Sequence, residues 1–127
     1  MRAALILLII IVASCKSNQQ SKICEADFDM FFKKFANDSV FQKRHVNFPL
    51  TSYYNESDSL KHYEVSENNY TFTDFTNDKT LYDVSTDIKK DSVVYTRLWR
   101  ESYGAMTFKF SRINNCWMLV EYRDITD

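Results

Sequence analysis

The sequence predicts one α+β domain in which helices come first and a bent antiparallel sheet follows. Helical spacing of apolar residues is found within residues 24–44, whereas residues 92–123 are rich in the β-branched and aromatic residues typical of strands. Two consecutive asparagines, Asn114 and Asn115, mark a tight hairpin within this second region. Helices followed by a run of antiparallel strands pack in two layers, so we expect the helices on one face of the sheet.

The first helix is predicted over residues 24–37. Its apolar residues follow the spacing i, i+3, i+4 and i+7 and form a single stripe: Phe28, Phe31, Phe32 and Phe35. Acidic residues lie in its first turns and lysines near its end, which the helix dipole favours. Residues 37–39 then end this helix and supply a cap for a short second helix over residues 40–44.

The middle of the chain predicts short strands separated by polar segments. Residues 45–50 alternate as a strand does, and Pro49 predicts a position at a sheet edge or at a strand end. Residues 51–69 are too polar for an assignment, whereas residues 70–75 and 81–84 have strand-like composition. Residues 87–91 are predicted to form a charged loop.

The C-terminal third predicts a strand over residues 92–100 and a hairpin that pairs residues 105–113 with 116–123. The register of a two-residue turn places Phe110 opposite Leu119 and Arg112 opposite Trp117. Phe108 and Met106 lie on the same face in this register. The other face then carries Cys116, Met118, Val120 and Tyr122.

The first fourteen residues predict a signal peptide. A single basic residue, Arg2, precedes an apolar run over residues 3–13, and small residues come before Cys15. This run is too short to span a membrane, which takes about 20 apolar residues. The stretch from Val12 to Cys15 resembles the lipobox of bacterial lipoproteins, which implies cleavage before Cys15 and acylation of its sulfur.

Three segments are therefore expected: a signal peptide over residues 1–14, a lipidated Cys15 with a short tether over residues 15–23, and one domain over residues 24–127. The lipid would anchor the protein to a membrane. Lys16, directly after the lipidated position, resembles lipoproteins that are passed to an outer membrane. The expected location is the cell envelope of a Gram-negative bacterium, at the outer membrane.

Composition excludes several classes of function. A formal net charge of −1 gives no electrostatic footprint for nucleic acid. A single glycine leaves no phosphate-binding loop, and the absence of Cys-x-x-Cys or Cys/His clusters predicts no metal site. We expect no cofactor.

Cys24 and Cys116 are candidates for a disulfide, the alternative being two free cysteines.

Two blocks of the sequence resemble a family of bacterial envelope lipoproteins known only as a domain of unknown function. Residues 28–50 resemble the start of that family, and residues 108–119 resemble its last hairpin. The family usually has glycine in the last turn, where this chain has Asn115. The resemblance implies a nuclear-transport-factor-2-like, or cystatin-like, fold, in which a helix packs into a bent sheet and leaves a conical cavity.

This resemblance implies a fold and not an activity. The first hypothesis is a non-enzymatic lipoprotein that binds a small apolar ligand or a protein partner beside the membrane. The alternatives are an isomerase or dehydratase that uses the conical pocket, and a structural module that forms a homodimer through its open sheet face. Buried ionisable groups in the cavity would favour the enzyme.

Six aromatic residues are candidates for the lining of such a cavity, although each also suits the core: Phe31, Phe35, Trp99, Phe108, Phe110 and Trp117. Five residues have side chains that could act as an acid, a base or a hydrogen-bond donor in catalysis: His45, Asp74, Tyr95, Tyr103 and Tyr122. Each is more simply a surface or half-buried strand residue, so no catalytic residue is predicted.

Overall fold

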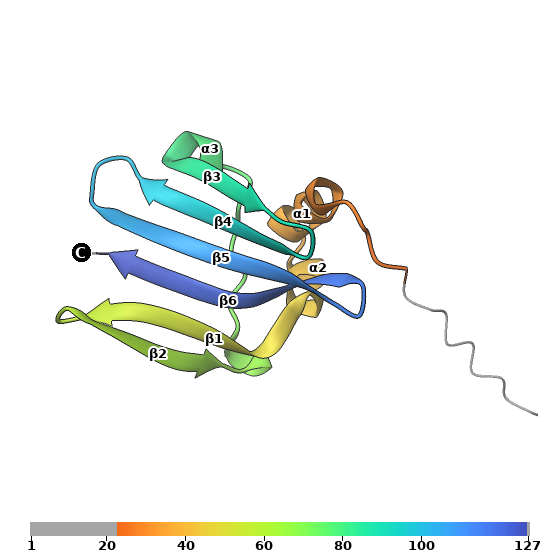
Figure 1. Ribbon diagram of the computed structural model, residues 1–127, viewed down its shortest axis with the longest axis horizontal. Coiled ribbons are helices and arrows are strands. Elements are labelled where there is room, and N and C mark those ends of the chain that lie inside the picture. Colours follow the sequence, from red (N-terminus) through yellow and green to blue (C-terminus); the bar gives the residue numbers. More distant parts are fainter. Residues whose placement is uncertain (1–22, 127) are drawn as a thin grey trace, which may run out of the picture.

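The computed structural model describes residues 23–126, which form helices followed by a six-stranded sheet. In chain order the elements are α1 (Phe28–Asn37), α2 (Ser39–Arg44), β1 (Val46–Glu56), β2 (Ser59–Val65), the 3₁₀ helix η1 (Glu67–Asn69), α3 (Asp78–Leu81), β3 (Tyr82–Ile88), β4 (Ser92–Trp99), β5 (Gly104–Ile113) and β6 (Cys116–Thr126) (Figure 1). The predicted signal peptide, the lipidation site Cys15 and nearly all of the tether lie outside the described residues. Within residues 23–126, no helix is both long enough and apolar enough to cross a bilayer.

The predicted α+β class is confirmed, but the sheet is mixed and not wholly antiparallel. Its strand order is β2-β1-β6-β5-β4-β3, and β1, next to the edge strand β2, runs parallel to β6. The other four neighbouring pairs are antiparallel. A short turn imposes antiparallel pairing only on strands that it joins, and β1 and β6 are the first and last strands of the chain. The composition of the individual strands therefore carried no information about this pairing.

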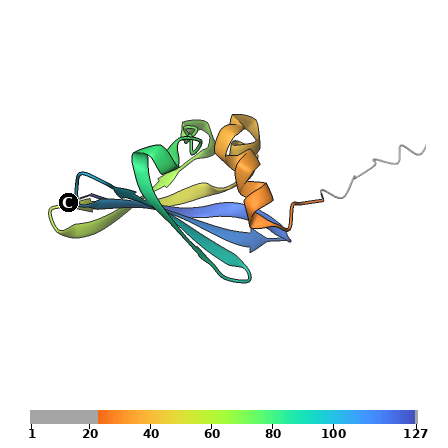
Figure 2. The ribbon, with the colours of Figure 1, turned by 90° about the horizontal axis from the view of Figure 1, so that it is seen from above.

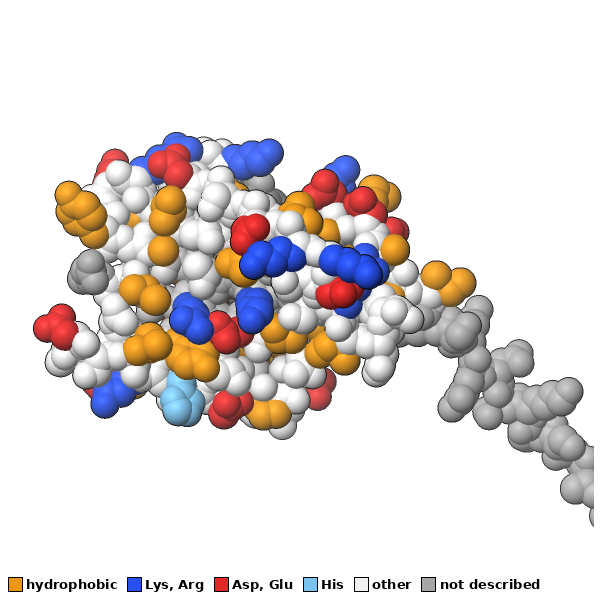
Figure 3. Space-filling model, in the orientation of Figure 1, with side chains coloured by type: hydrophobic (Ala, Val, Ile, Leu, Met, Phe, Trp, Pro, Cys, Tyr) orange, Lys and Arg blue, Asp and Glu red, His pale blue; other side chains and the backbone are white. Residues whose placement is uncertain are grey.

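All three α-helices lie on the same face of the sheet, and they cover only part of it (Figure 2). The opposite face carries no layer of secondary structure and presents a mixture of basic, acidic and hydrophobic side chains (Figure 3). On this exposed face the Arg123 guanidinium pairs with Glu121 at 2.6 Å. The core therefore lies in one layer, between the helices and the sheet.

Two aspartates set the bounds of the first helices. The Asp27 carboxylate accepts a hydrogen bond from the Met30 amide at 2.9 Å, so α1 begins at Phe28 and not at Cys24. Asp38 ends α1 and caps α2, because its carboxylate accepts bonds from the amides of Val40 and Phe41. The predicted break at residues 37–39 is thus confirmed.

A disulfide joins the segment before α1 to the start of β6. Cys24 and Cys116 are 92 residues apart in sequence, and their Cα atoms are 5.1 Å apart. The backbone oxygen of Ala26 also accepts hydrogen bonds from the Trp117 indole, at 3.1 Å, and from the Arg112 guanidinium, at 2.7 Å. These contacts fix the chain immediately before α1 against the β5–β6 hairpin.

The predicted register of that hairpin is confirmed near the turn and wrong further along. Phe110 pairs with Leu119, and Asn114 and Asn115 have the positive φ values that the turn requires. A bulge then inserts Val120, because Lys109 pairs with Glu121. The extra residue reverses the two faces of β6. Tyr122 therefore pairs with Phe108 on the core side, with ring centroids 5.0 Å apart, and not on the opposite face.

Pro49 and residues 70–75 also depart from expectation. Pro49 lies inside β1, an inner strand, but at a shift of register where neither β2 nor β6 pairs with it. Its missing N–H therefore costs no ladder hydrogen bond. Residues 70–75 form no strand, and cross the helical face of the sheet as an irregular segment that we call the strap.

Candidate ligand-binding cavity

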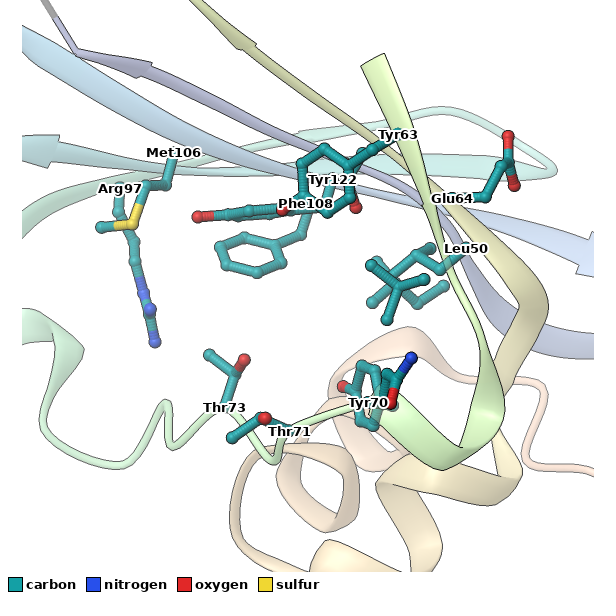
Figure 4. A pocket seen from close by; sticks show the side chains of 14 residues that line it. Leu50, Tyr63, Glu64, Tyr70, Thr71, Thr73, Arg97, Met106, Phe108 and Tyr122 are labelled. Carbon is teal, nitrogen blue, oxygen red and sulfur yellow. The ribbon is translucent and has the colours of Figure 1, made fainter.

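A cavity of about 580 Å³ lies between the sheet and the strap. Apolar side chains from four strands form much of its wall: Leu50, Val65, Met106, Phe108 and Leu119. Its polar lining includes Ser52, Asn69, Thr71, Thr73 and Arg97, with tyrosines at positions 63, 70 and 122 and Glu64. Figure 4 shows Arg97 and Met106 toward one end of the cavity, Leu50 toward the other end, and Phe108 and Tyr122 between them. Apolar and polar side chains are thus present at both ends of the cavity, and Arg97 marks one of them.

Arg97 is only 5% exposed, and several contacts hold its guanidinium in one position. Its Nε donates to the Asp78 carboxylate at 2.6 Å, and one terminal nitrogen, Nη2, donates to the backbone oxygen of Asp74 at 2.7 Å. The guanidinium carbon lies 4.3 Å from the ring centroid of Phe75 and 5.2 Å from that of Phe108. The Tyr82 ring lies at 5.1 Å, so the cation is fixed by an ion pair, a backbone acceptor and three aromatic rings.

Asp78 also binds a second strand residue. The Tyr95 hydroxyl donates to the same carboxylate oxygen as Arg97, at 2.7 Å. Burial raises the pKa of Tyr95, and the hydrogen bond to Asp78 raises it further. The carboxylate therefore joins α3 to two inward-facing positions of β4, and this cluster supports the end of the cavity at which Arg97 lies.

The strap is held by one buried side chain, Gln42 of α2. Its amide nitrogen donates to the backbone oxygens of Phe35 and Thr73, both at 2.8 Å. Its amide oxygen accepts from the Tyr70 hydroxyl at 2.7 Å and from the Thr73 amide at 2.9 Å. All these groups are satisfied at once, so Gln42 gives an irregular segment a defined position over the sheet.

Two hydroxyl groups of the lining differ in their surroundings, and the one on Ser52 has no hydrogen-bond partner among residues 23–126. Ser52 is 1% exposed, and its Oγ is buried and unpaired. The Tyr122 hydroxyl also belongs to the lining, and burial, followed by the nearby Asp124 charge, raises the pKa of this phenol. Both side chains are therefore neutral and keep their O–H donors at ordinary pH.

Of the six aromatic residues predicted to line a cavity, only Phe108 lies on this one. Phe35 and Phe110 are 0% exposed and belong to the closed core, where their ring centroids are 5.1 Å apart. Phe31 and Trp117 border a smaller hollow beside the disulfide. Trp99 is 41% exposed and packs on Tyr82 at the outer part of the sheet. The phenylalanine stripe is excluded from the cavity because α1 covers only the other end of the sheet.

The residues considered for catalysis lie apart from one another. His45 is buried against Phe41, with ring centroids 4.0 Å apart, and lines the smaller hollow. The Asp74 carboxylate is exposed and accepts two hydrogen bonds from Thr76, which lower the pKa of Asp74. Tyr103 is 89% exposed. Only Tyr122 of these five lines the main cavity, so the structure does not bring them together as a site.

Sequence reasoning missed Arg97, Asp78, Ser52 and Gln42. One signal was available for Arg97, because Val93, Tyr95 and Arg97 alternate along β4 and all face the core. A charge at a core-facing position of a strand indicates a buried partner. No comparable signal identified Gln42, because the importance of its amide depends on a strap that the sequence did not reveal.

Helices that precede a six-stranded mixed sheet, with a cavity on the helical face, define an α+β fold of the nuclear-transport-factor-2-like (NTF2-like) class. A crystal structure of an NTF2-like protein from Bacteroides fragilis matches with a TM-score of 0.61 and 20% sequence identity. The match covers 82% of this chain and 48% of that one, so this chain spans about half the length of that protein. The likeness shows the fold alone.

A de novo protein from work on the design of diverse pocket structures matches more weakly. It has a TM-score of 0.40 and 9% identity over 79% of this chain and 95% of its own, and we base no argument on it. No protein-family model matches the sequence, and no curated protein resembles it significantly.

Proposed function

We propose that this protein is a lipid-anchored binding protein of the bacterial cell envelope, which holds a small amphipathic ligand in its main cavity. The observation that carries the proposal is the cavity itself, about 580 Å³ in volume, whose wall combines apolar side chains of the sheet with fixed polar groups such as Arg97. Ligand sites in proteins are typically cavities of about 300–1,000 Å³ with mostly apolar walls and a few fixed polar groups. The lining around Arg97 and Leu50 has this character.

The envelope location rests on the sequence before the domain. A signal peptide over residues 1–14 that is followed directly by Cys15 is the pattern of an acylated lipoprotein. Stable anchoring needs more than one acyl chain, which lipoprotein acylation supplies. A disulfide between Cys24 and Cys116 also suits an oxidising compartment. With Cys24 nine positions after Cys15, the tether reaches roughly 30 Å when extended, so the domain works close to the membrane.

The first test concerns the ligand. The protein is released from its own cell envelope by proteolysis within the tether, and is weighed by native mass spectrometry before and after denaturation. We expect excess mass that is lost on denaturation, because a ligand that fills an apolar cavity stays bound through purification. If the monomer and dimer have the mass of the protein alone, even after gentle extraction, the result would argue against a bound ligand and would favour a protein-interaction module.

The second test concerns the anchor. In cells given labelled palmitate, the wild-type protein should carry the label in the membrane fraction. A Cys15→Ala variant should carry no label, because it lacks the thiol that is acylated. Cys116→Ala, which leaves position 15 intact, is the matched control and should still be labelled. Equal labelling of the Cys15→Ala variant would overturn lipidation at this residue.

A further inference from the structure

The Arg97 guanidinium has more donors than partners. It carries five N–H groups, of which one on Nε and one on Nη2 are used by Asp78 and Asp74. Nη1 makes no hydrogen bond to any residue between positions 23 and 126. Because Arg97 also lines the cavity, its remaining donors are available to an acceptor oxygen bound there. A guanidinium N–H that has no acceptor in the protein can donate a charge-assisted hydrogen bond to such an oxygen.

The Asp78 carboxylate already neutralises the charge of Arg97, and this restricts which kind of ligand oxygen can bind there. Its partner Asp78 is 3% exposed, so the pair is buried with no net charge. Arg97 is the one cationic side chain in the described lining, whereas Glu64 lies at the rim and Asp124 lies beside Tyr122. The Asp124 Oδ1 is itself buried and has no hydrogen-bond partner in the described chain. The end of the cavity at which Arg97 lies thus combines free donors with a neutral or negative surrounding charge.

A carbonyl oxygen and a carboxylate respond differently to this environment. A carbonyl accepts from the free N–H groups and carries no charge for Asp78 to repel. A carboxylate bound to the same guanidinium would lie close to Asp78, and like charges brought together without solvent are strongly unfavourable. Extra positive charge to offset this repulsion is absent from the described lining.

The shape of the cavity adds a requirement for length. Arg97 is on β4 and Leu50 is on β1, with β5 and β6 between them. Strands lie about 4.8 Å apart, so the two backbones are separated by roughly 14 Å. Figure 4 shows Arg97 and Leu50 on opposite sides of the enclosed space. A ligand that contacts both residues is therefore elongated.

Building on the proposed ligand-binding function, we infer that the cavity selects an elongated, uncharged ligand whose carbonyl oxygen binds Arg97, and that it rejects the matching carboxylate. Amides, esters and ketones with an apolar tail belong to this class. Fatty acids in their ionised form do not.

The test compares decanamide with decanoate, which have the same length and nearly the same shape but differ in charge. The anchored full-length mature protein is placed in phospholipid nanodiscs at neutral pH, and both dissociation constants are measured by calorimetry, with empty nanodiscs as the blank. We expect decanamide to bind at least about tenfold more tightly than decanoate. The same pair is then measured on Asp78→Asn, which keeps a hydrogen-bond acceptor for Arg97 and removes the negative charge. We expect the ratio of the two affinities to shift toward decanoate by about tenfold or more.

Each outcome decides a different statement. Decanoate binding as tightly as decanamide to the wild-type protein would overturn the charge selectivity and leave the binding function intact. Failure of both compounds to bind would overturn the inference and count against the proposed function as well. If Asp78→Asn folds and the affinity ratio is unchanged, Asp78 does not set the selectivity and the inference fails. If Asp78→Asn does not fold, the wild-type ratio alone decides.

Discussion

The sheet is filled differently at its two ends. At the end beside the disulfide, which we call the closed end, α1 places Phe28 and Phe35 against Trp117 and Phe110, with ring centroids 5.3 and 5.1 Å apart. At the other end, which we call the open end, the strap crosses the sheet and a cavity of about 580 Å³ remains. Both ends share strands β5 and β6. The cavity therefore exists because of what covers the sheet, and not because of the sheet itself.

The two ends also differ in how polar groups are used. The closed end consists mainly of phenylalanine rings, which stabilise the fold through burial and contribute no directional hydrogen bonds. At the open end, Gln42, Asp78 and Arg97 are buried and fix the strap and the strand side chains through hydrogen bonds. We conclude that stability is concentrated at the closed end and that oriented donors are concentrated at the open end.

The largest expected effect comes from removing one ring at the closed end. Phe110 is 0% exposed and contacts the rings of Phe28, Phe31 and Phe35. We expect Phe110→Ala to lower the free energy of unfolding by about 3–5 kcal/mol, because nothing moves into the space. Phe108→Ala, two residues along the same strand, should cost less because that side chain borders an existing cavity. Urea unfolding of both variants measures the difference, and equal losses would contradict the comparison.

Gln42→Met should produce the next largest effect. Methionine preserves length and volume but leaves four hydrogen-bonding groups of the strap and of α1 without a partner. We expect a loss of about 2–4 kcal/mol in stability and faster hydrogen exchange at the Thr73 amide. Arg44→Met, an exposed position on the same helix, is the control and should change stability by less than about 0.5 kcal/mol. Unchanged exchange at Thr73 would show that Gln42 does not hold the strap.

Much of the closed end was predictable from the sequence, because its pattern is local. The spacing of Phe28, Phe31 and Phe35 identifies a buried helix face, and Asn114 and Asn115 identify the hairpin that this helix covers. Both signals depend only on residues within a few positions of each other. The order of elements then sufficed for the α+β class, whereas the NTF2-like fold was implied by the resemblance of residues 28–50 and 108–119 to a lipoprotein family.

The open end was not predictable, because its structure depends on contacts between distant residues. The bulge at Val120 brings Tyr122 onto the core side, although alternation from Trp117 places it outside. Residues 70–75 have the composition of a strand, but Gln42 takes up the hydrogen-bonding groups of Thr73, 31 positions away. Parallel pairing of β1 with β6 also joins opposite ends of the chain. None of these features leaves a local pattern.

Alkaline pH should weaken the open end selectively. Burial raises the pKa of Tyr70 and Tyr122 above the value of 10.0 for a free tyrosine, whereas phenylalanines at the closed end do not titrate. The unfolded chain loses these protons first, so stability is constant below about pH 10 and falls as pH rises above it. Because Tyr122 is partly solvated, we expect about 1 kcal/mol from it at roughly pH 11. The free energy of unfolding is measured with urea below about pH 10 and again at roughly pH 11. It should fall less between these two pH values for Tyr122→Phe than for the wild-type protein. An equal fall in both proteins would show that Tyr122 makes no contribution.

The smallest effect on stability is expected for Ser52→Ala, and its sign is informative. The Ser52 hydroxyl is buried at the cavity wall without a partner in residues 23–126, so its removal relieves an unsatisfied polar group. We expect stability to rise by up to about 1 kcal/mol. The phenylalanine core of the closed end contains no comparable serine. The control is therefore Ser111→Ala on β5, which should leave the free energy of unfolding nearly unchanged.

The same Ser52→Ala variant separates a structural role from a binding role. If the hydroxyl serves a ligand, the more stable variant should bind the natural ligand found by native mass spectrometry more weakly, because that ligand loses a hydrogen bond. If the variant is more stable and retains all its bound ligand, the Ser52 hydroxyl is an unsatisfied polar group with no role in binding. A less stable protein would show that the hydroxyl is satisfied within the fold, and would remove Ser52 from the set of free donors at the open end.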